Sequence, residues 1–174
     1  MLRRDWTKDY RETVGADGRK RYVYIGKRYE LPRESRRTYQ NRVMPVLVAL
    51  LAAQAAWGLI DTPASRTLYV ALTWAAVLFS AALALFDAAR ILLVRRALTA
   101  RDYTSSALRL KRTLLITLAL SALQLAMDLV YLILKGFPGA DHLFFIIHLL
   151  ALGLSILAWR HEKQAIWNAL PPTA

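Results

Sequence analysis

The chain has 174 residues, 56% of them hydrophobic, and a formal net charge of +12 at pH 7. This length suits a single domain, but the apolar content is too high for an ordinary soluble one. The sequence contains no Cys, which excludes disulfide exchange, thiolate catalysis and Cys-ligated metal sites. Because the apolar residues form long blocks with charged residues between them, the sequence indicates an integral membrane protein.

Residues 1-31 predict a small cytoplasmic β-hairpin or meander that is rich in basic residues. Tyr and Val alternate with charged residues, and the Asp17-Gly18 pair is typical of a hairpin turn. The segment RYEL, residues 28-31, is a candidate third strand. Residues 32-42 then predict a basic helix lying beside the membrane.

Four apolar segments predict transmembrane helices, at about 43-60, 68-94, 113-134 and 143-159. Each has roughly 17 residues or more, close to the minimum of about 17 to 25 for a helix that crosses a bilayer. The fold class is therefore predicted to be an all-α membrane protein, with a four-span helical bundle over residues 43-160 between the β-hairpin and a cytoplasmic tail at 161-174. The residues before the first span lack the apolar core of a cleavable signal peptide, so this span is expected to direct insertion.

The distribution of Lys and Arg orients the predicted spans. The flanks on one side hold four in residues 33-42, six in 95-112 and two after residue 159. The loops on the other side, 61-67 and 135-142, hold one each. Since positively charged flanks stay in the cytoplasm, both termini are predicted to be cytoplasmic. A prokaryotic plasma membrane is the expected location.

Polar residues recur within the apolar helices at intervals of three, four or seven residues, which places them on one face of each helix. In the third span they are Thr117, Ser121, Gln124, Asp128 and Tyr131. The second span carries Thr73, Ser80, Asp87 and Arg90, the fourth carries His148 and Ser155, and the first carries Gln54. These faces are expected to converge, because hydrocarbon offers no hydrogen-bond partners.

Two groups of these residues are candidate sites. The outer group, a candidate polar or proton site, consists of Asp128, His148, Gln54, Thr73 and Tyr131. Asp128 and His148 lie equally far from the loop between their spans, so they are predicted to touch, and such a pair can share a proton. Nearer the cytoplasm, Asp87 and Arg90 predict an ion pair. The simpler interpretation of all these residues is structural, as hydrogen-bond partners between helices.

Familiar catalytic and metal sites have no counterpart in the sequence. One His and one Asp at a shared depth do not make a zinc site, and the other two His residues fall at opposite membrane faces, which leaves no pair of haem ligands. No Ser, His and Asp share a depth, and neither a Gly-rich phosphate loop nor an HExxH motif is present. We therefore expect no metal and no cofactor.

Seven basic residues near the N-terminus predict a surface that binds the membrane or a partner: Arg19, Lys20, Arg21, Lys27, Arg28, Arg36 and Arg37. Anionic headgroups are the favoured ligand, because each Lys or Arg close to such a surface contributes about 1 kcal/mol. A protein partner or a second copy of the chain is the alternative. The mixed basic and aromatic residues of this region also suit nucleic acid, which ranks last.

The sequence leads to three hypotheses for function. The first is a non-enzymatic adaptor or accessory subunit whose basic cytoplasmic face engages anionic lipid or a partner protein. The second is an oligomeric proton-linked transporter or channel for small solutes, and the third is a lipid-modifying enzyme within the membrane. A dry hydrogen-bonded core favours the adaptor, a hydrated polar track favours transport, and a lateral opening beside Asp128 favours the enzyme.

Overall fold

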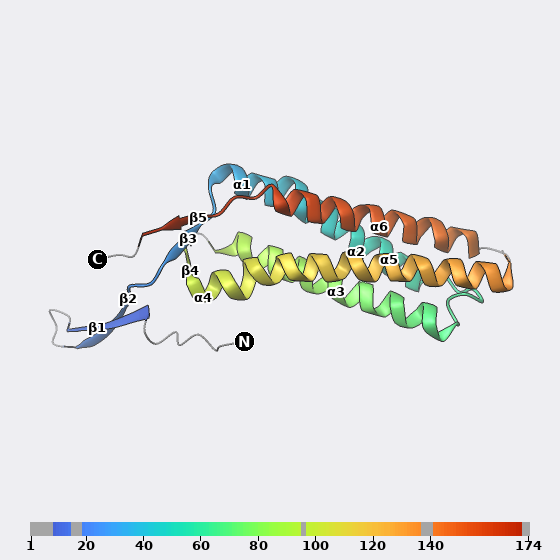
Figure 1. The fold of residues 1–174 in the computed structure, drawn as a ribbon, viewed down its shortest axis with the longest axis horizontal. Coiled ribbons are helices and arrows are strands. Elements are labelled where there is room, and N and C mark those ends of the chain that lie inside the picture. The colour runs from blue at the N-terminus through green and yellow to red at the C-terminus, as the bar shows by residue number, and fades with distance from the viewer. Residues whose placement is uncertain (1–8, 15–18, 95–96, 137–140, 172–174) are drawn as a thin grey trace.

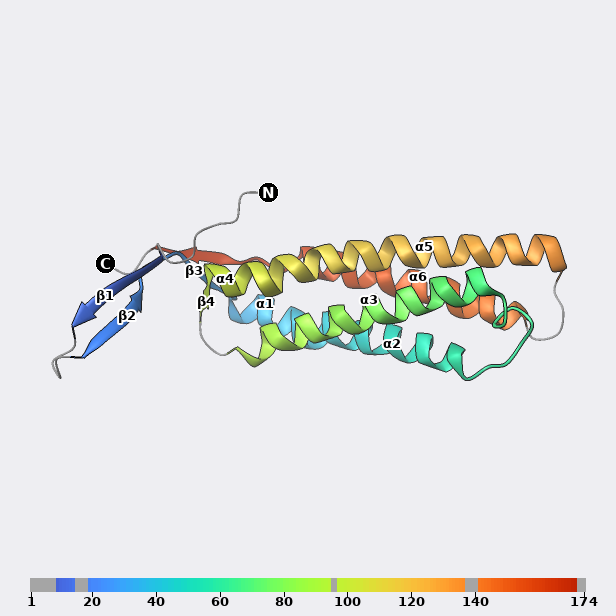
Figure 2. The same ribbon diagram turned by 90° about the horizontal axis from the view of Figure 1, so that it is seen from below.

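The computed structural model of the chain describes residues 9-14, 19-94, 97-136 and 141-171. The long helices lie alongside one another, and the strands gather at one end, which we call the sheet end (Figures 1 and 2). The helices are α1 (Arg33–Thr38), α2 (Met44–Gly58), α3 (Leu68–Leu93), α4 (Ala100–Tyr103), α5 (Arg109–Lys135) and α6 (Asp141–Lys163). Turns of π-helix at Tyr39–Val43 and Thr104–Leu108 join α1 to α2 and α4 to α5.

Three helices in the described part of the chain are long and apolar enough to cross a membrane: Leu68–Leu93, Ala100–Lys135 and Asp141–Lys163. Their outward faces carry large apolar side chains such as Phe79, Phe86 and Leu149, which are exposed along their length. An apolar surface of this extent suits contact with lipid. The predicted first span corresponds to α2, which has 15 residues and is shorter than the roughly 17 that a span needs.

Each long helix packs against two neighbours, because α3 and α6 both contact α2 and α5. Small side chains line these interfaces. Ala81, Ala84 and Ala88 of α3 and Ala151 and Ala158 of α6 are fully buried. Small residues let helix backbones approach closely, which favours packing in lipid, where no hydrophobic force draws helices together. The Ala pattern therefore fixes which faces of α3 and α6 point inward.

The strands of the described residues form two antiparallel sheets. They are β1 (Tyr10–Val14), β2 (Lys20–Tyr24), β3 (Arg28–Glu30), β4 (Leu98–Thr99) and β5 (Asn168–Leu170). β1 pairs with β2, so the predicted N-terminal hairpin is confirmed, although its Asp17-Gly18 turn lies outside the described residues. β3 does not extend this hairpin into a meander. It is the central strand of a second sheet, with β4 and β5 on either side, so that sheet joins segments from the start, middle and end of the chain.

A tyrosine connects the hairpin to the helices. The Tyr24 hydroxyl donates to the carbonyl of Lys27 at 2.9 Å and accepts from the backbone N–H of Ala100 at 2.9 Å. The Tyr10 ring packs edge-on against the Tyr24 ring, with the ring centres 5.2 Å apart. The Ala100 N–H begins α4, where backbone donors have no partner within the helix. Tyr24 therefore fixes both the turn after β2 and the start of α4.

Replacing Gly26 with Ala is expected to loosen this connection. An added Cβ would lie 2.5 Å from the Tyr24 hydroxyl oxygen, which its two hydrogen bonds hold in place. We expect a local loss of roughly 1 to 3 kcal/mol, the usual range for overpacking, seen as faster amide exchange in β1 and β2. Gly153→Ala is the matched control, because a Cβ there meets no atom within 4 Å. Equal exchange in both variants would contradict the expectation.

Candidate functional site

Four side chains form a continuous line of hydrogen bonds across the interior, which we call the buried polar chain: Asp128, His148, Gln124 and Gln54. His148 Nδ1 bonds Asp128 Oδ2, so the predicted contact between these residues is confirmed. His148 Nε2 lies 2.8 Å from Gln124 Nε2. Gln124 and Gln54 then exchange two amide hydrogen bonds, at 3.2 and 3.3 Å. The chain thereby links α2, α5 and α6.

Helical spacing explains how these residues meet. Gln124 and Asp128 are four residues apart on α5, which places them one turn apart on the same face. His148 lies on α6 and spans the distance between them, with one ring nitrogen toward each. The exposed fraction is 0% for His148, Gln124 and Gln54 and 4% for Asp128. All four side chains are therefore shielded from water and lipid, and they depend on one another for hydrogen bonds.

The amide orientation of Gln124 determines the state of His148. Gln124 Nε2 donates one hydrogen to Gln54 Oε1 and the other to His148 Nε2. His148 Nε2 is then an acceptor without a proton, so the ring proton lies on Nδ1 and is donated to the Asp128 carboxylate. The arrangement is a neutral imidazole held between an amide and a carboxylate.

Aromatic rings cover the buried polar chain on one side. The Trp57 ring stacks on His148, with ring centres 5.4 Å apart, and on Trp74, with ring centres 5.0 Å apart. Phe144 packs edge-on against Trp57 at 5.1 Å. The indole N–H of Trp74 donates to the Gln54 carbonyl at 2.8 Å. The rings therefore contribute both packing and one further hydrogen bond around Gln54.

Two residues of the predicted outer group bond elsewhere. The Thr73 hydroxyl donates to carbonyls of its own helix, those of Tyr69 at 3.0 Å and Val70 at 2.9 Å. The Tyr131 hydroxyl donates to Asp141 Oδ2 at 3.2 Å, at the start of α6. Gln124, which the sequence placed on the same polar face but not in the site, is the residue that joins the others.

The predicted ion pair between Asp87 and Arg90 is corrected by the structure. Asp87 is 1% exposed and binds Arg109, whose Nε donates to both carboxylate oxygens at 2.8 and 3.0 Å. Arg90 lies instead 3.8 Å from Asp102. The reason is that the helix of the third span begins earlier than residue 113 and brings Arg109 beside α3. A signal was present, because Arg109 continues the polar face of that helix in steps of four residues.

The other Ser and Thr residues of the predicted polar faces have mixed roles. Ser121 and Ser155 bond each other at 3.0 Å across α5 and α6, as the structural interpretation predicts. Thr117 and Ser80 do not reach another helix, because each hydroxyl donates to a carbonyl of its own helix, at 2.8 and 3.0 Å. Hydroxyls satisfied in this way cost little in lipid, so they give no indication of a site.

The predicted basic surface residues all lie at the sheet end or on the hairpin beyond it (Figure 2). Two of them, Arg28 and Arg36, are half-buried. The others are exposed: Arg19, Lys20, Arg21, Lys27 and Arg37. Lys20 pairs with Glu12 at 2.7 Å. Arg36 has a structural role, because its guanidinium donates to the carbonyls of Leu92 and Val94, which end α3. A cation there caps unpaired carbonyls and faces the negative end of the helix dipole.

One buried acid at the sheet end had no signal in the sequence. Glu162 is 1% exposed, accepts a hydrogen bond from the Tyr39 hydroxyl at 3.1 Å and lies 3.9 Å from the Lys111 ammonium. Burial, together with the negative charge of Glu162, raises the pKa of Tyr39 well above that of an ordinary tyrosine. Glu162 was assigned to the predicted tail, but α6 extends through it to Lys163.

Across the described ranges, no group of three or more His, Cys, Asp and Glu residues is placed to hold a metal ion. The buried polar chain and the basic residues of the sheet end are thus the two candidate sites. Comparisons of the chain with protein-family models, with curated proteins and with solved structures gave no match.

Proposed function

We propose that the chain is a four-span membrane adaptor or accessory subunit whose sheet end lies in the cytoplasm and engages anionic lipid or a partner protein. The buried polar chain carries the proposal. Its members are 0 to 4% exposed and bond one another, so they act in holding the helices in register. A polar core of this kind specifies packing, while the charged groups suited to recognition lie at the sheet end.

The second sheet supports four crossings. β3 pairs with both β4 and β5, so the three strands lie on the same side of any membrane that the helices cross. α5 and α6 lie between β4 and β5 and form one crossing out and one back. Between β3 and β4 stand α2 and α3, and a crossing by α3 alone would separate the two strands. A crossing by α2 as well would keep the strands together, and the helical residues from Arg33 to Val43 lengthen α2 at its basic end.

The charges support a cytoplasmic sheet end. The basic residues of α1, α4 and the start of α5 lie there, whereas the far end of the described structure holds Arg66 and Lys135. Arg66 is bound to Asp61 at 2.6 Å and lowers the pKa of that carboxyl, which keeps Asp61 ionised and neutralises the arginine. The far end therefore presents fewer Lys and Arg residues than the sheet end, and this asymmetry is what orients membrane helices.

Single cysteines are expected to report this orientation, since the chain has no Cys of its own. Leu59 is 87% exposed at the far end, so Leu59→Cys should react with an impermeant thiol reagent in intact cells. Arg101→Cys, at an exposed position of α4, should react only after the cells are made permeable. The reverse pattern would invert the proposed orientation, and labelling of both in intact cells would rule out the shared topology.

The lipid-binding role is tested with the full chain in nanodiscs of phosphatidylcholine, with or without phosphatidylglycerol. Anionic lipid should slow amide exchange in β2, and high salt should reverse the effect. The triple variant Arg19→Glu, Lys20→Glu, Arg21→Glu should lose the protection. The control carries Arg66→Glu and Lys135→Glu at the far end and should keep it. Protection that ignores lipid charge and salt would exclude a lipid-binding hairpin and leave a protein partner.

The contact between Asp128 and His148 favours a second function, an oligomeric proton-linked transporter or channel. A carboxylate and an imidazole in direct hydrogen-bond contact can pass a proton between them. Transport would require water to reach this pair through the aromatic cover formed by Trp57 and Trp74. Proton-coupled flux in proteoliposomes that is abolished by Asp128→Asn would favour this function over the adaptor.

A further inference from the structure

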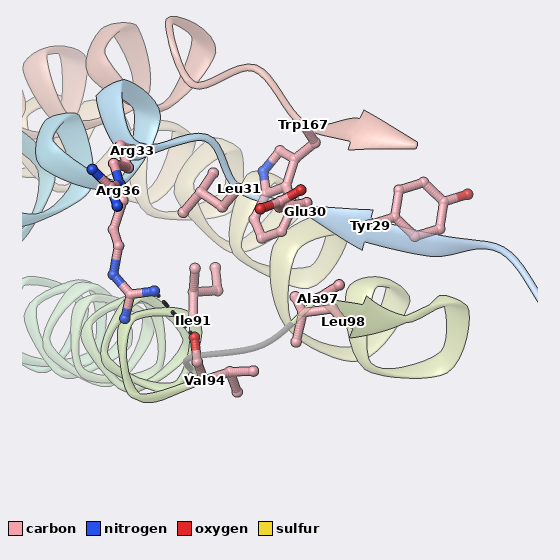
Figure 3. A pocket seen from close by; sticks show the side chains of 10 residues that line it. All are labelled: Tyr29, Glu30, Leu31, Arg33, Arg36, Ile91, Val94, Ala97, Leu98 and Trp167. Atoms are coloured by element: carbon pink, nitrogen blue, oxygen red, sulfur yellow. Dashed lines mark hydrogen bonds between the residues drawn. The ribbon is translucent and has the colours of Figure 1, made fainter. Parts of the chain in front are cut away.

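A cavity of about 280 Å³ lies at the sheet end, between the second sheet and the end of α3 (Figure 3). Its lining residues lie in or beside β3, α1, the end of α3, β4 and β5, and they include Glu30, Arg33 and Arg36. These residues come from five separate segments, so the cavity exists only when α1, α3 and the second sheet are assembled. Its volume is close to the lower limit of about 300 Å³ for small-ligand sites, which suits a headgroup better than a whole lipid.

The cavity has a cationic side and an apolar side. Arg33 and Arg36 are both on α1, three residues apart, and therefore project from one face of the helix. Arg36 is held in place by the carbonyls of Leu92 and Val94. A guanidinium has five N–H donors, so these two bonds leave donors available for an anion. Ile91 and Val94 form the apolar wall at the point where α3 ends.

We propose that this cavity binds the phosphodiester headgroup of one anionic phospholipid. The phosphate lies between Arg33 and Arg36, and the glycerol hydroxyls of the headgroup reach the Glu30 carboxylate. Two guanidinium groups and one carboxylate give the cavity a net charge of +1, which one phosphodiester neutralises. Planar guanidinium groups are also well matched to phosphate oxygens.

The apolar wall selects a lipid over free phosphate. Ile91 and Val94 belong to the end of an apolar helix that is long enough to cross a membrane, so a headgroup in the cavity can keep its acyl chains in the hydrocarbon beside α3. Inorganic phosphate would gain nothing from these side chains. This inference rests on the proposed function in one respect, the placement of the sheet end at a membrane surface.

The test is native mass spectrometry of the full chain in detergent, with dioleoylphosphatidylglycerol added. We expect one lipid to remain bound per chain. Arg33→Gln should weaken its retention by about tenfold or more, as expected for the loss of a charge-assisted hydrogen bond. Arg112→Gln removes the same charge at an exposed position that neither lines the cavity nor belongs to the predicted basic surface, and it should retain the lipid. Equal losses in the two variants would mean diffuse attraction and overturn the site.

A second variant tests whether the lipid needs the space of the cavity as well as its charged residues. Ala97→Trp fills the space and leaves every charged residue in place, so it should abolish retention of the lipid. Glycerol phosphate or inorganic phosphate that displaces the lipid at equal concentration would overturn the lipid assignment in favour of a phosphate site. Retention of phosphatidylcholine as strong as that of phosphatidylglycerol would overturn the selectivity for an anionic lipid. The exchange test of the hairpin uses other residues, so either proposal can fail while the other stands.

Discussion

His148→Ala is expected to lower the free energy of unfolding by about 3 kcal/mol, the upper end of the usual cost of removing a hydrogen bond to a buried charged group. It strands the Asp128 carboxylate and the amide of Gln124 in an interior without water. Asp128→Asn should cost less, about 1 to 2 kcal/mol, because an amide can still accept from His148 Nδ1 but without the charge. Reversible unfolding in mixed detergent micelles measures both.

The double variant decides whether the two residues act together. Once His148 is gone, the Asp128 carboxylate has lost its donor, so Asp128→Asn should then restore stability instead of reducing it. The coupling is expected to be roughly 0.5 to 3 kcal/mol. Thr73→Val is the control at a similar depth, since its hydroxyl bonds only its own helix, and it should change stability by less than about 0.5 kcal/mol. Strictly additive losses would exclude an energetic link across the buried polar chain.

Arg109→Gln is expected to have an effect of similar size, about 2 to 3 kcal/mol, below the range for a fully buried pair because the Arg109 side chain is 49% exposed. Asp87 is 1% exposed and receives its bidentate hydrogen bonds from Arg109, so the variant leaves a buried carboxylate without a cation. Arg90→Gln removes the same charge from the position that the sequence had favoured. It should cost little, because Arg90 is half-exposed and 3.8 Å from Asp102.

The same unfolding measurement applies to the Asp87 pair, and the second-site change Asp87→Asn sharpens it. Added to Arg109→Gln, it neutralises the stranded carboxylate and should recover part of the lost stability. A larger loss from Arg90→Gln than from Arg109→Gln would restore the pairing expected from sequence.

Periodicity within a helix was the reliable source of prediction. Counting residues outward from a short loop placed Asp128 and His148 at one depth, and the contact follows because α5 and α6 are neighbouring helices that run in opposite directions from this loop. Such counting requires only the helix rise and the position of the loop. Depth could not reveal the partners of Thr73 and Tyr131. The Thr73 hydroxyl bonds carbonyls of its own helix, and the Tyr131 hydroxyl bonds Asp141 at the start of the next helix. A hydroxyl finds such acceptors at any depth in the bundle.

The contacts that the sequence did not predict involve segments outside the apolar blocks, where hydropathy does not mark the ends of helices or strands. The sequence also predicts that a helix capped by Asp102 or Thr104 runs into the third span, and Arg109 is indeed helical. Arg109 was counted only as a positive flank of that span, so its contact with Asp87 was missed. β5 has three residues, too few to show the alternation that identifies a strand. β5 forms because β3 offers it a backbone edge to pair with. Since β3 lies near the other end of the chain, the local sequence of β5 does not predict this pairing.

The central position of β3 also has a consequence for biosynthesis. β3 leaves the ribosome before the long helices, while its partner strands emerge after α3 and after α6. The edge of β3 that pairs with β5 therefore remains unpaired until translation is almost complete, and an unpaired strand edge invites association with other chains. If the helices insert as proposed, pairing is possible only for a chain in which every helix has crossed in the correct direction. Closure of this sheet would then distinguish correctly inserted molecules from misinserted ones.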